Sequence, residues 1–157
     1  MLVPHVLQEP VVVLVEDDVQ TRDGYAELLS RAGFRVISSD NAECALAQCI
    51  ELVPDVVVTD IALPGRDGFG LAADLRCQVS TRGIPVVAMT AHWSPDVHQR
   101  AVEVGMTAIL SKPCQPEHLI AELQRVLEQT RLPRLARSAA VAIDYARTRI
   151  AQAKSHP

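Results

Sequence analysis

Two apolar runs of the sequence end in acidic residues, and these acids have the clearest capacity for chemistry. Residues 11–15 lead into Glu16 and Asp17, and residues 56–59 lead into Asp60. Short runs of β-branched residues are typical of buried parallel strands. Because open α/β sheets keep their chemistry at the carboxyl ends of the strands, we expect the three carboxylates to meet at one edge of a sheet.

A hydroxyl group and an ammonium group follow two later strands. Thr90 ends the apolar run that starts at Ile84, and Lys112 follows Ser111. Carboxylates that converge repel one another, and their pKa values rise unless a cation lies among them. A site of oxygen ligands and waters suits Mg²⁺, with Mn²⁺ as the alternative. The sequence therefore predicts a divalent-cation site beside one carboxylate, Asp60, that can act as a nucleophile.

In these residues the chain resembles the receiver domain of bacterial two-component response regulators. The resemblance covers residue 11 to about residue 129, and the spacing agrees: Thr90 lies 30 residues after Asp60, and Lys112 lies 22 residues after Thr90. Each motif alone is weak, whereas all of them in this order on successive strand ends are specific. The motifs are Leu14-Val15-Glu16-Asp17-Asp18, Asp60 with Pro64 and Asp67-Gly68, Thr90-Ala91, and Ser111-Lys112-Pro113.

The resemblance implies a chemical role for three residues. Asp60 would be the phosphoacceptor, which attacks the phosphoryl group of a kinase phosphohistidine or of a small donor such as acetyl phosphate. Lys112 would pair first with Asp60 and then with a phosphoryl oxygen. Thr90 would move its hydroxyl onto the phosphoryl group after the transfer. A cis peptide bond between Lys112 and Pro113 is also implied.

The resemblance further implies how the metal ion is held. Asp17 would bind it directly and Glu16 mainly through water, while Asp60 and the main-chain carbonyl of Ala62 would complete the protein ligands. Phosphatases that form an aspartyl phosphate typically have an Asp-x-Asp motif, and here Ala62 occupies the position of the second acid. We therefore expect no enzyme activity beyond the chain's own phosphorylation and dephosphorylation.

The residues that would transmit the signal depart from the family pattern. Three positions before the lysine the family usually has an aromatic side chain that rotates between two states, and here Ile109 stands there. An aliphatic switch would give a smaller change. Thr107 and Ala108 replace an acidic pair that the DNA-binding branch uses for dimer salt bridges, so we do not expect that dimer. Trp93 either packs locally or belongs to a docking surface.

Strand and helix patterns alternate along the chain, with short loops between them. Five such pairs predict an α/β fold with a parallel, doubly wound sheet. The resemblance implies the flavodoxin-like strand order 2-1-3-4-5, and we expect a C-terminal helical extension beyond it. In the second helix we expect Ala45, Leu46, Cys49 and Ile50 to point inward. The expected strands are residues 11–15, 34–38, 56–60, 84–90 and 107–111, and the expected helices are residues 19–32, 41–52, 67–79, 95–105 and 116–129.

Charge divides the 157-residue chain, whose net charge is −4. Residues 1–129 carry a net charge of −9, and residues 130–157 carry +5. We expect residues 1–10 to be a flexible leader, residues 11–129 the receiver domain, and residues 130–157 a basic helical extension. A basic tail can bind nucleic acid, but this one lacks a second helix long enough for a helix-turn-helix. We therefore expect it to pack on the domain, to form a homodimer or to bind a partner.

The function that these features predict is a phosphorylation-activated signalling switch. Its expected partners are a histidine kinase or phosphotransfer protein and a downstream protein. The alternative is a receiver fragment of a longer response regulator whose output domain is missing. No apolar run is long enough to span a membrane, no signal peptide is recognisable, and the four cysteines show no metal-type spacing. We therefore expect a cytoplasmic protein with free thiols and no membrane partner.

Overall fold

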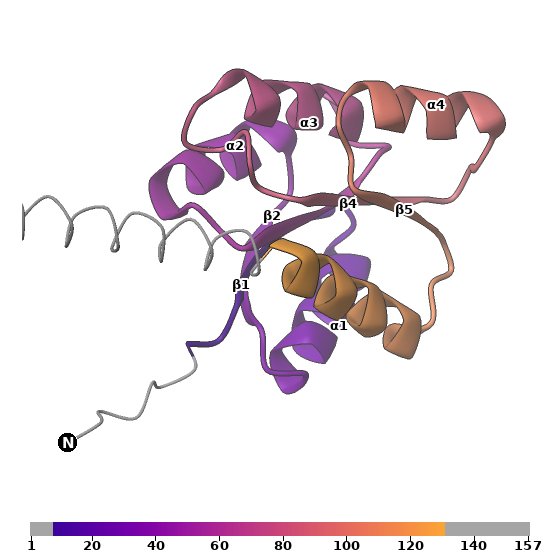
Figure 1. The fold of residues 1–157 in the computed structure, drawn as a ribbon. Coiled ribbons are helices and arrows are strands. Elements are labelled where there is room, and N and C mark those ends of the chain that lie inside the picture. Colours follow the sequence, from indigo (N-terminus) through magenta and orange to yellow (C-terminus); the bar gives the residue numbers. More distant parts are fainter. Residues whose placement is uncertain (1–7, 131–157) are drawn as a thin grey trace, which may run out of the picture. The chain divides into compact units, whose positions relative to one another are not determined.

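Five parallel strands form one sheet within residues 8–130, which are the residues that the structure, a computed structural model, describes (Figure 1). The strands lie side by side in the order β2-β1-β3-β4-β5. This confirms the predicted α/β class, the parallel sheet and the strand order. The strands are β1 (Val11–Val15), β2 (Arg35–Ser39), β3 (Val56–Asp60), β4 (Val86–Thr90) and β5 (Ala108–Ser111).

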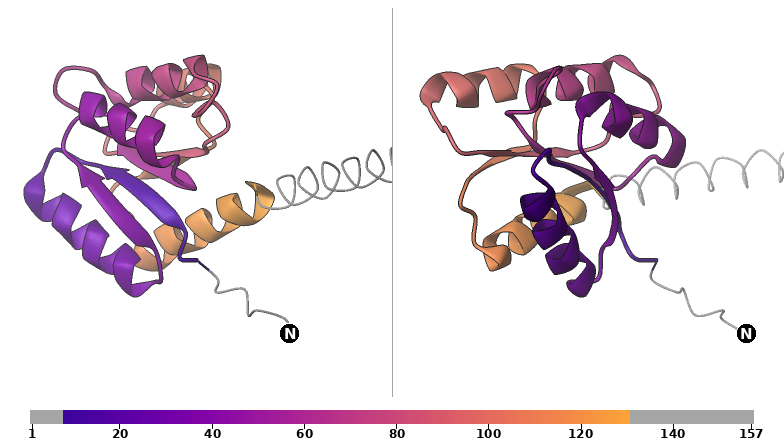
Figure 2. Two further views of the ribbon diagram at one scale, coloured as in Figure 1. Left: turned by 90° about the vertical axis from the view of Figure 1, so that its left-hand side faces the viewer. Right: turned by 180° about the vertical axis from the view of Figure 1, so that it is seen from behind.

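Helices cover both faces of this sheet (Figures 1 and 2). On one face lie α2 (Ala42–Leu52), α3 (Gly68–Cys77) and α4 (Pro95–Glu103), and on the other lies α1 (Val19–Arg31). Residues 116–130 form a further helix. The chain divides into two compact units, residues 1–123 and residues 124–157. None of the helices described between residues 8 and 130 is both long enough and apolar enough to cross a membrane.

The predicted leader and extension lie almost entirely outside the described residues. Of the leader, the structure describes only residues 8–10, and of the extension only residue 130. The boundaries at residues 10 and 129 therefore stay predictions.

Short polar residues begin four of the helices. Asp18, Asn41, Asp67 and Ser94 each accept a hydrogen bond from the main-chain N–H three residues later. These bonds satisfy N–H groups that the first turn of a helix leaves without a partner. Gly33 follows α1 with a φ of 93°, a left-handed conformation that glycine adopts at low cost. The helix starts at residues 19, 42, 68 and 95 thus follow from local sequence.

The end of α3 differs from the prediction. The helix ends at Cys77, two residues before the expected end, and Val79 is 81% exposed. The hydroxyl of Thr81, a fully buried residue, donates a hydrogen bond of 2.7 Å to the carbonyl of Leu75. Because this bond holds the following turn against the last residues of α3, the helix cannot continue along its apolar pattern.

The inward face of α2 also differs from the prediction. The buried residues of this helix are Ala42, Ala45 and Cys49, whereas Ile50 is 41% exposed. The prediction that Ile50 points inward was wrong, because the helix buries a narrow stripe of small side chains rather than a broad apolar face. The helix ends at Leu52, and the residue that caps it, Val53, has a φ of 44°, which is uncommon for a β-branched residue.

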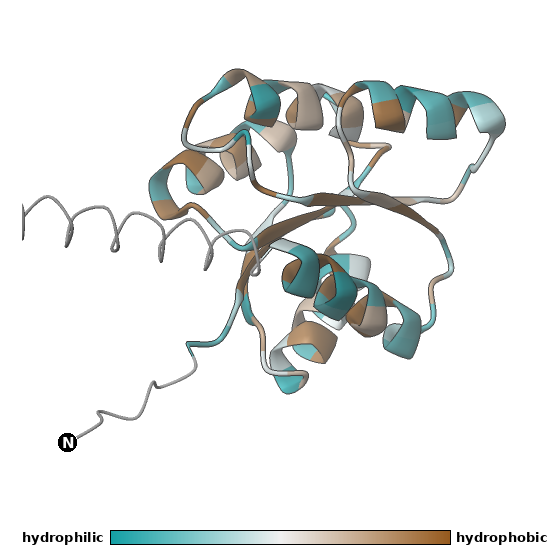
Figure 3. Cartoon of the chain, in the orientation of Figure 1, coloured by the Kyte–Doolittle hydropathy of each residue, from teal (hydrophilic) through white to brown (hydrophobic). Residues whose placement is uncertain are grey.

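The central strands form the core of the sheet. Residues 12–15 of β1, residues 56–58 of β3 and residues 86–88 of β4 are each at most 1% exposed. Figure 3 shows the strands as the most hydrophobic part of the described chain, with hydrophilic residues on the outer surfaces of the helices. A sheet covered on both faces explains why these strands are continuous apolar runs without alternation.

The cysteines give a direct test of this packing. Cys49 is fully buried, and burial raises the pKa of its thiol to about 12, whereas Cys44 and Cys77 are exposed. Because the thiolate is the reactive form, only about one Cys49 in 10⁴ is reactive at pH 8 even when reagent reaches it. Maleimide should therefore modify Cys44 and Cys77 in the native protein, and Cys49 only after unfolding. Peptide mapping that finds Cys49 modified as fast as Cys44 in the native state would contradict this packing.

Candidate functional site

Strand register brings the predicted site residues to one edge of the sheet. Val15 of β1 pairs with Thr59 of β3, so Glu16 and Asp60 are the next residues on neighbouring strands. Farther along the sheet, Asp60 pairs with Met89, and Thr90 pairs with Ser111, the residue before Lys112. Four strands of the described chain therefore deliver their polar side chains to the same end.

Three carboxylates converge at this edge. One oxygen from each of Glu16, Asp17 and Asp60 lies within 4.8 Å of the other two. The side chain of Glu16 is 4% exposed and that of Asp60 is 11% exposed, whereas Asp17 is exposed. A set of carboxylate oxygens open to solvent on one side suits a hard divalent cation that keeps part of its water shell. These residues therefore fit Mg²⁺ or Mn²⁺ in the chemistry of their donor atoms.

Lys112 lies between two of these carboxylates. Its Nζ donates hydrogen bonds to Oε2 of Glu16 at 2.5 Å and to Oδ2 of Asp60 at 3.1 Å. Burial lowers the pKa of Lys112, but the hydrogen bonds to Glu16 and Asp60 outweigh burial and raise it overall. Burial raises the pKa of Glu16, and the bond from Lys112 opposes that effect without cancelling it. The lysine therefore stays charged at neutral pH and offsets part of the repulsion among the acids.

The loop after β1 is held by hydrogen bonds from several sides. The N–H of Asp18 donates to Oε1 of Glu16 at 3.2 Å, and the N–H of Glu16 donates to the carbonyl of Ser39 at 3.1 Å. A guanidinium nitrogen of Arg22 donates to the carbonyl of Glu16 at 2.9 Å and to that of Asp17 at 3.4 Å. Sequence reasoning missed Arg22. Its place one helical turn after the acids was the available signal.

The loop after β3 carries Ala62, and it turns back closely on the end of its own strand. The N–H of Ala62 donates to Oδ1 of Asp60 at 3.1 Å, and the N–H of Gly68 donates to the carbonyl of Ile61 at 2.9 Å. A Cβ at residue 68 would stand 2.5 Å from the carbonyl oxygen of Asp60. Glycine is therefore needed for the close approach of α3 to the strand.

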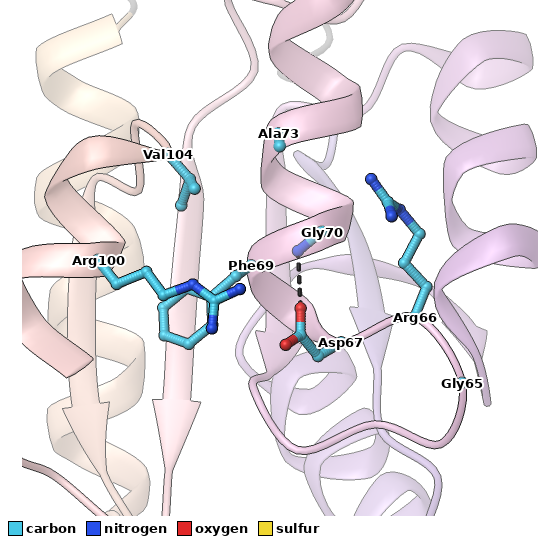
Figure 4. Close-up of a pocket in the computed structure, with 8 residues that line it drawn as sticks. All are labelled: Gly65, Arg66, Asp67, Phe69, Gly70, Ala73, Arg100 and Val104. Atoms are coloured by element: carbon cyan, nitrogen blue, oxygen red, sulfur yellow. Dashed lines mark hydrogen bonds between the residues drawn. The ribbon is translucent and has the colours of Figure 1, made fainter. Parts of the chain in front are cut away.

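A cavity of about 420 Å³ lies beside this loop, between α3 and α4 (Figure 4). Two arginines define its walls. Arg66 makes a two-pronged ion pair with Asp74, and the guanidinium of Arg100 lies 4.5 Å from the centre of the Phe69 ring. Figure 4 shows Arg100 and Phe69 on one side and Asp67 on the other. The ion pair and the cation–π contact hold the loop and α4 against α3.

The remaining predicted residues lie around the acidic cluster rather than in it. Thr90 is 6% exposed, its hydroxyl accepts a hydrogen bond of 3.1 Å from the N–H of His92, and its carbonyl accepts one of 2.8 Å from the N–H of Lys112. The Lys112–Pro113 peptide bond is cis. Ile109 pairs with Ala88 and is partly buried against the core. Trp93 is 54% exposed in the loop before α4.

The sequence is similar to proteins of known families. Residues 12–124 match the family model described as the response regulator receiver domain. The chain is 32% identical over 119 residues to the phosphate regulon transcriptional regulatory protein PhoB of Pseudomonas aeruginosa, covering 76% of this chain and 52% of that protein. It is also 37% identical over 134 residues to the sensor histidine kinase AruS of the same species, covering 83% of this chain and 13% of that kinase. The matched region therefore spans about half of the first relative and a small part of the second.

The fold is also similar to that of a solved structure. The chemotaxis protein CheY4 of Vibrio cholerae matches with a TM-score of 0.73 and 31% identity, over 75% of this chain and 98% of that one.

Proposed function

The chain belongs to the receiver domain family of response regulators, and we propose that it works as a phosphorylation-activated switch with Asp60 as the phosphoacceptor. Receiver domains are signalling switches rather than classical enzymes. The observation that carries the assignment to Asp60 is the convergence of Glu16, Asp17 and Lys112 on its carboxylate. Asp60 is also the member of the cluster whose strand lies between the strands of the other groups.

The acidic cluster is the proposed metal site. Asp17 and Asp60 would hold Mg²⁺ or Mn²⁺ through carboxylate oxygens, Glu16 through water, and Ala62 through its main-chain carbonyl. When bound, the ion would neutralise negative charge on the phosphoryl oxygens during transfer. Solvent exposure and hydrogen bonding support these roles. The side chain of Asp17 is exposed to solvent, whereas that of Glu16 is buried and accepts hydrogen bonds from Lys112 and from the N–H of Asp18.

The transfer itself is a nucleophilic displacement at phosphorus. A carboxylate oxygen of Asp60 forms a bond to phosphorus while the bond from phosphorus to the donor breaks, and that electron pair leaves with the donor. The donor is a phosphohistidine or a small acyl phosphate. Lys112 stays within reach of the new group, because its Nζ already donates to Asp60. The ammonium offsets the additional negative charge that the phosphoryl group brings.

The proposed response to phosphorylation is a movement near Thr90. In the structure its hydroxyl accepts from the N–H of His92, so a turn of the hydroxyl toward the phosphoryl oxygens would break that bond and free the loop before α4. The proposed partner surface includes α4 and β5. Ile109 on β5 would limit the change there, because its side chain is smaller than an aromatic ring.

The proposed partners are proteins on either side of the switch. A histidine kinase or phosphotransfer protein would supply the phosphoryl group, and a downstream protein would bind the changed surface. We propose residues 11–129 as the receiver domain and residues 130–157 as a basic extension that binds a partner or a second copy of the chain. The four cysteines are free thiols, which fits a reducing compartment such as the cytoplasm.

Metal removal tests the proposed function directly. Radiolabelled acetyl phosphate with Mg²⁺ should label the 157-residue chain, and the label should be released by hydroxylamine, as expected of an acyl phosphate. EDTA should lower the initial rate to below about a tenth, because charge neutralisation by the metal supplies several kcal/mol in such transfers. Added Mg²⁺ or Mn²⁺ in excess of the chelator should restore the rate. Labelling that is equally fast in EDTA would exclude the proposed metal site.

A further inference from the structure

Arg22 is a charged residue that contacts the site through the main chain of Glu16 and Asp17. It lies in the first turns of α1, and its N–H donates to the carbonyl of Asp18 in the ordinary helical pattern at 2.9 Å. Its guanidinium reaches back over that turn to the carbonyls of Glu16 and Asp17. A single side chain therefore contacts the main chain of Glu16 and Asp17, two of the three residues whose carboxylates form the acidic cluster.

We propose that Arg22 is a positioning residue that fixes the carboxylates of Glu16 and Asp17 for metal binding. This inference rests on the proposed function, in which these carboxylates hold Mg²⁺. The two carbonyls lie on the loop between β1 and α1, and holding them fixes the main chain from which the side chains of Glu16 and Asp17 project. Bonds from a guanidinium are stronger than bonds between neutral groups, so Arg22 holds this loop more firmly than an uncharged donor would.

The position of Arg22 and its charge predict opposite effects of its removal on Mg²⁺ affinity. Judged by charge alone, a guanidinium near the site repels a divalent cation, so its removal should tighten metal binding. Judged by position, removal lets the loop move and spreads the carboxylates, so metal binding should weaken. Residues that orient metal ligands typically contribute 10–100-fold to metal affinity. We expect an effect near the low end, about 10-fold, because Arg22 is partly exposed.

The test compares three variants of the 157-residue chain. Arg22→Gln removes the charge, and Arg22→Lys keeps the charge on a single nitrogen without the planar guanidinium. Arg31→Gln is the matched control, because Arg31 lies on the same helix and its side chain is 79% exposed in an ion pair with Glu27. The Mg²⁺ dissociation constant is measured by calorimetry, and amide hydrogen exchange at Asp18 reports the bond to Glu16 in the absence of metal.

Arg22→Gln should raise the Mg²⁺ dissociation constant about 10-fold and speed exchange of the Asp18 amide. Arg22→Lys should recover part of the affinity, and Arg31→Gln should leave both values unchanged. With acetyl phosphate, Arg22→Gln should need more Mg²⁺ for half-maximal labelling, and its rate at saturating Mg²⁺ should approach that of the wild type.

Two outcomes would overturn the inference. Unchanged or tighter Mg²⁺ binding in Arg22→Gln would show that charge rather than position governs this residue. Weaker binding accompanied by a large drop in melting temperature, with no local change at Asp18, would show that Arg22 supports the fold in general. A wild-type protein that binds Mg²⁺ but is never labelled would count against the proposed function instead, so the two failures are distinguishable.

Discussion

Asp60→Asn is expected to reduce labelling by acetyl phosphate to below about 1% of the wild-type level, because an amide cannot replace the carboxylate as a nucleophile. The substitution is nearly isosteric. The side-chain oxygen can still accept the hydrogen bond from the N–H of Ala62, and Lys112 keeps its contact with Glu16. The fold should therefore persist, with a melting temperature within a few degrees of the wild type. The measurement is incorporation of label over time at saturating Mg²⁺.

Asp96→Asn is the control for the loss of one acidic charge. Asp96 lies exposed in the first turn of α4, is not a member of the acidic cluster, and should keep the wild-type labelling rate. If Asp60→Asn is labelled as fully as this control, Asp60 is not the phosphoacceptor. The most direct follow-up would then be mass-spectrometric mapping of the label among Glu16 and Asp17.

Gly68→Ala should disrupt both the fold and the site. The added Cβ would stand 2.5 Å from the carbonyl oxygen of Asp60 and 2.9 Å from Cα of Ile61, and both of these are main-chain atoms. No side-chain rotation can relieve such a contact, so either α3 or the end of β3 must move. We expect a loss of about 3 kcal/mol in the free energy of unfolding, at the upper end for overpacking, and a melting temperature lower by about 10 °C.

Gly24→Ala is the matched control for the glycine substitution. Gly24 lies inside α1, and a Cβ there would meet nothing within 4 Å. Because alanine favours the helix over glycine, this variant should gain about 0.5–1 kcal/mol. Urea unfolding of the two variants should therefore shift in opposite directions. A Gly68→Ala protein as stable as the wild type would show that α3 can retreat from the strand at little cost.

Strand pattern and register account for most of what the sequence predicted correctly. Continuous apolar runs predicted the central strands, and polar residues directly after those runs had to meet at one edge of the sheet. For the same reason Glu16, Asp17, Asp60 and Lys112 could be placed together before the structure was known. The helix starts followed from their capping residues, which act over three residues and so are visible in local sequence.

Features that depend on tertiary contacts could not be predicted. Ile50 has the spacing of an inward residue, but the rotation of α2 on the sheet decides which stripe is buried. The early end of α3 depends on Thr81, which acts across six residues. Arg22 acts through main-chain carbonyls, so its spacing from the acids was the only signal that the sequence offered for it. These details follow from how elements pack, and a single sequence records packing only indirectly.

The position of Lys112 between Glu16 and Asp60 has a consequence for magnesium supply. The ammonium group of Lys112 already donates to two of the acids and offsets part of their repulsion, so we expect the strands to stay together without the ion. When Mg²⁺ is scarce, the protein would then stay folded but would not be phosphorylated. When Mg²⁺ becomes available again, the same molecules could be phosphorylated without new synthesis or refolding.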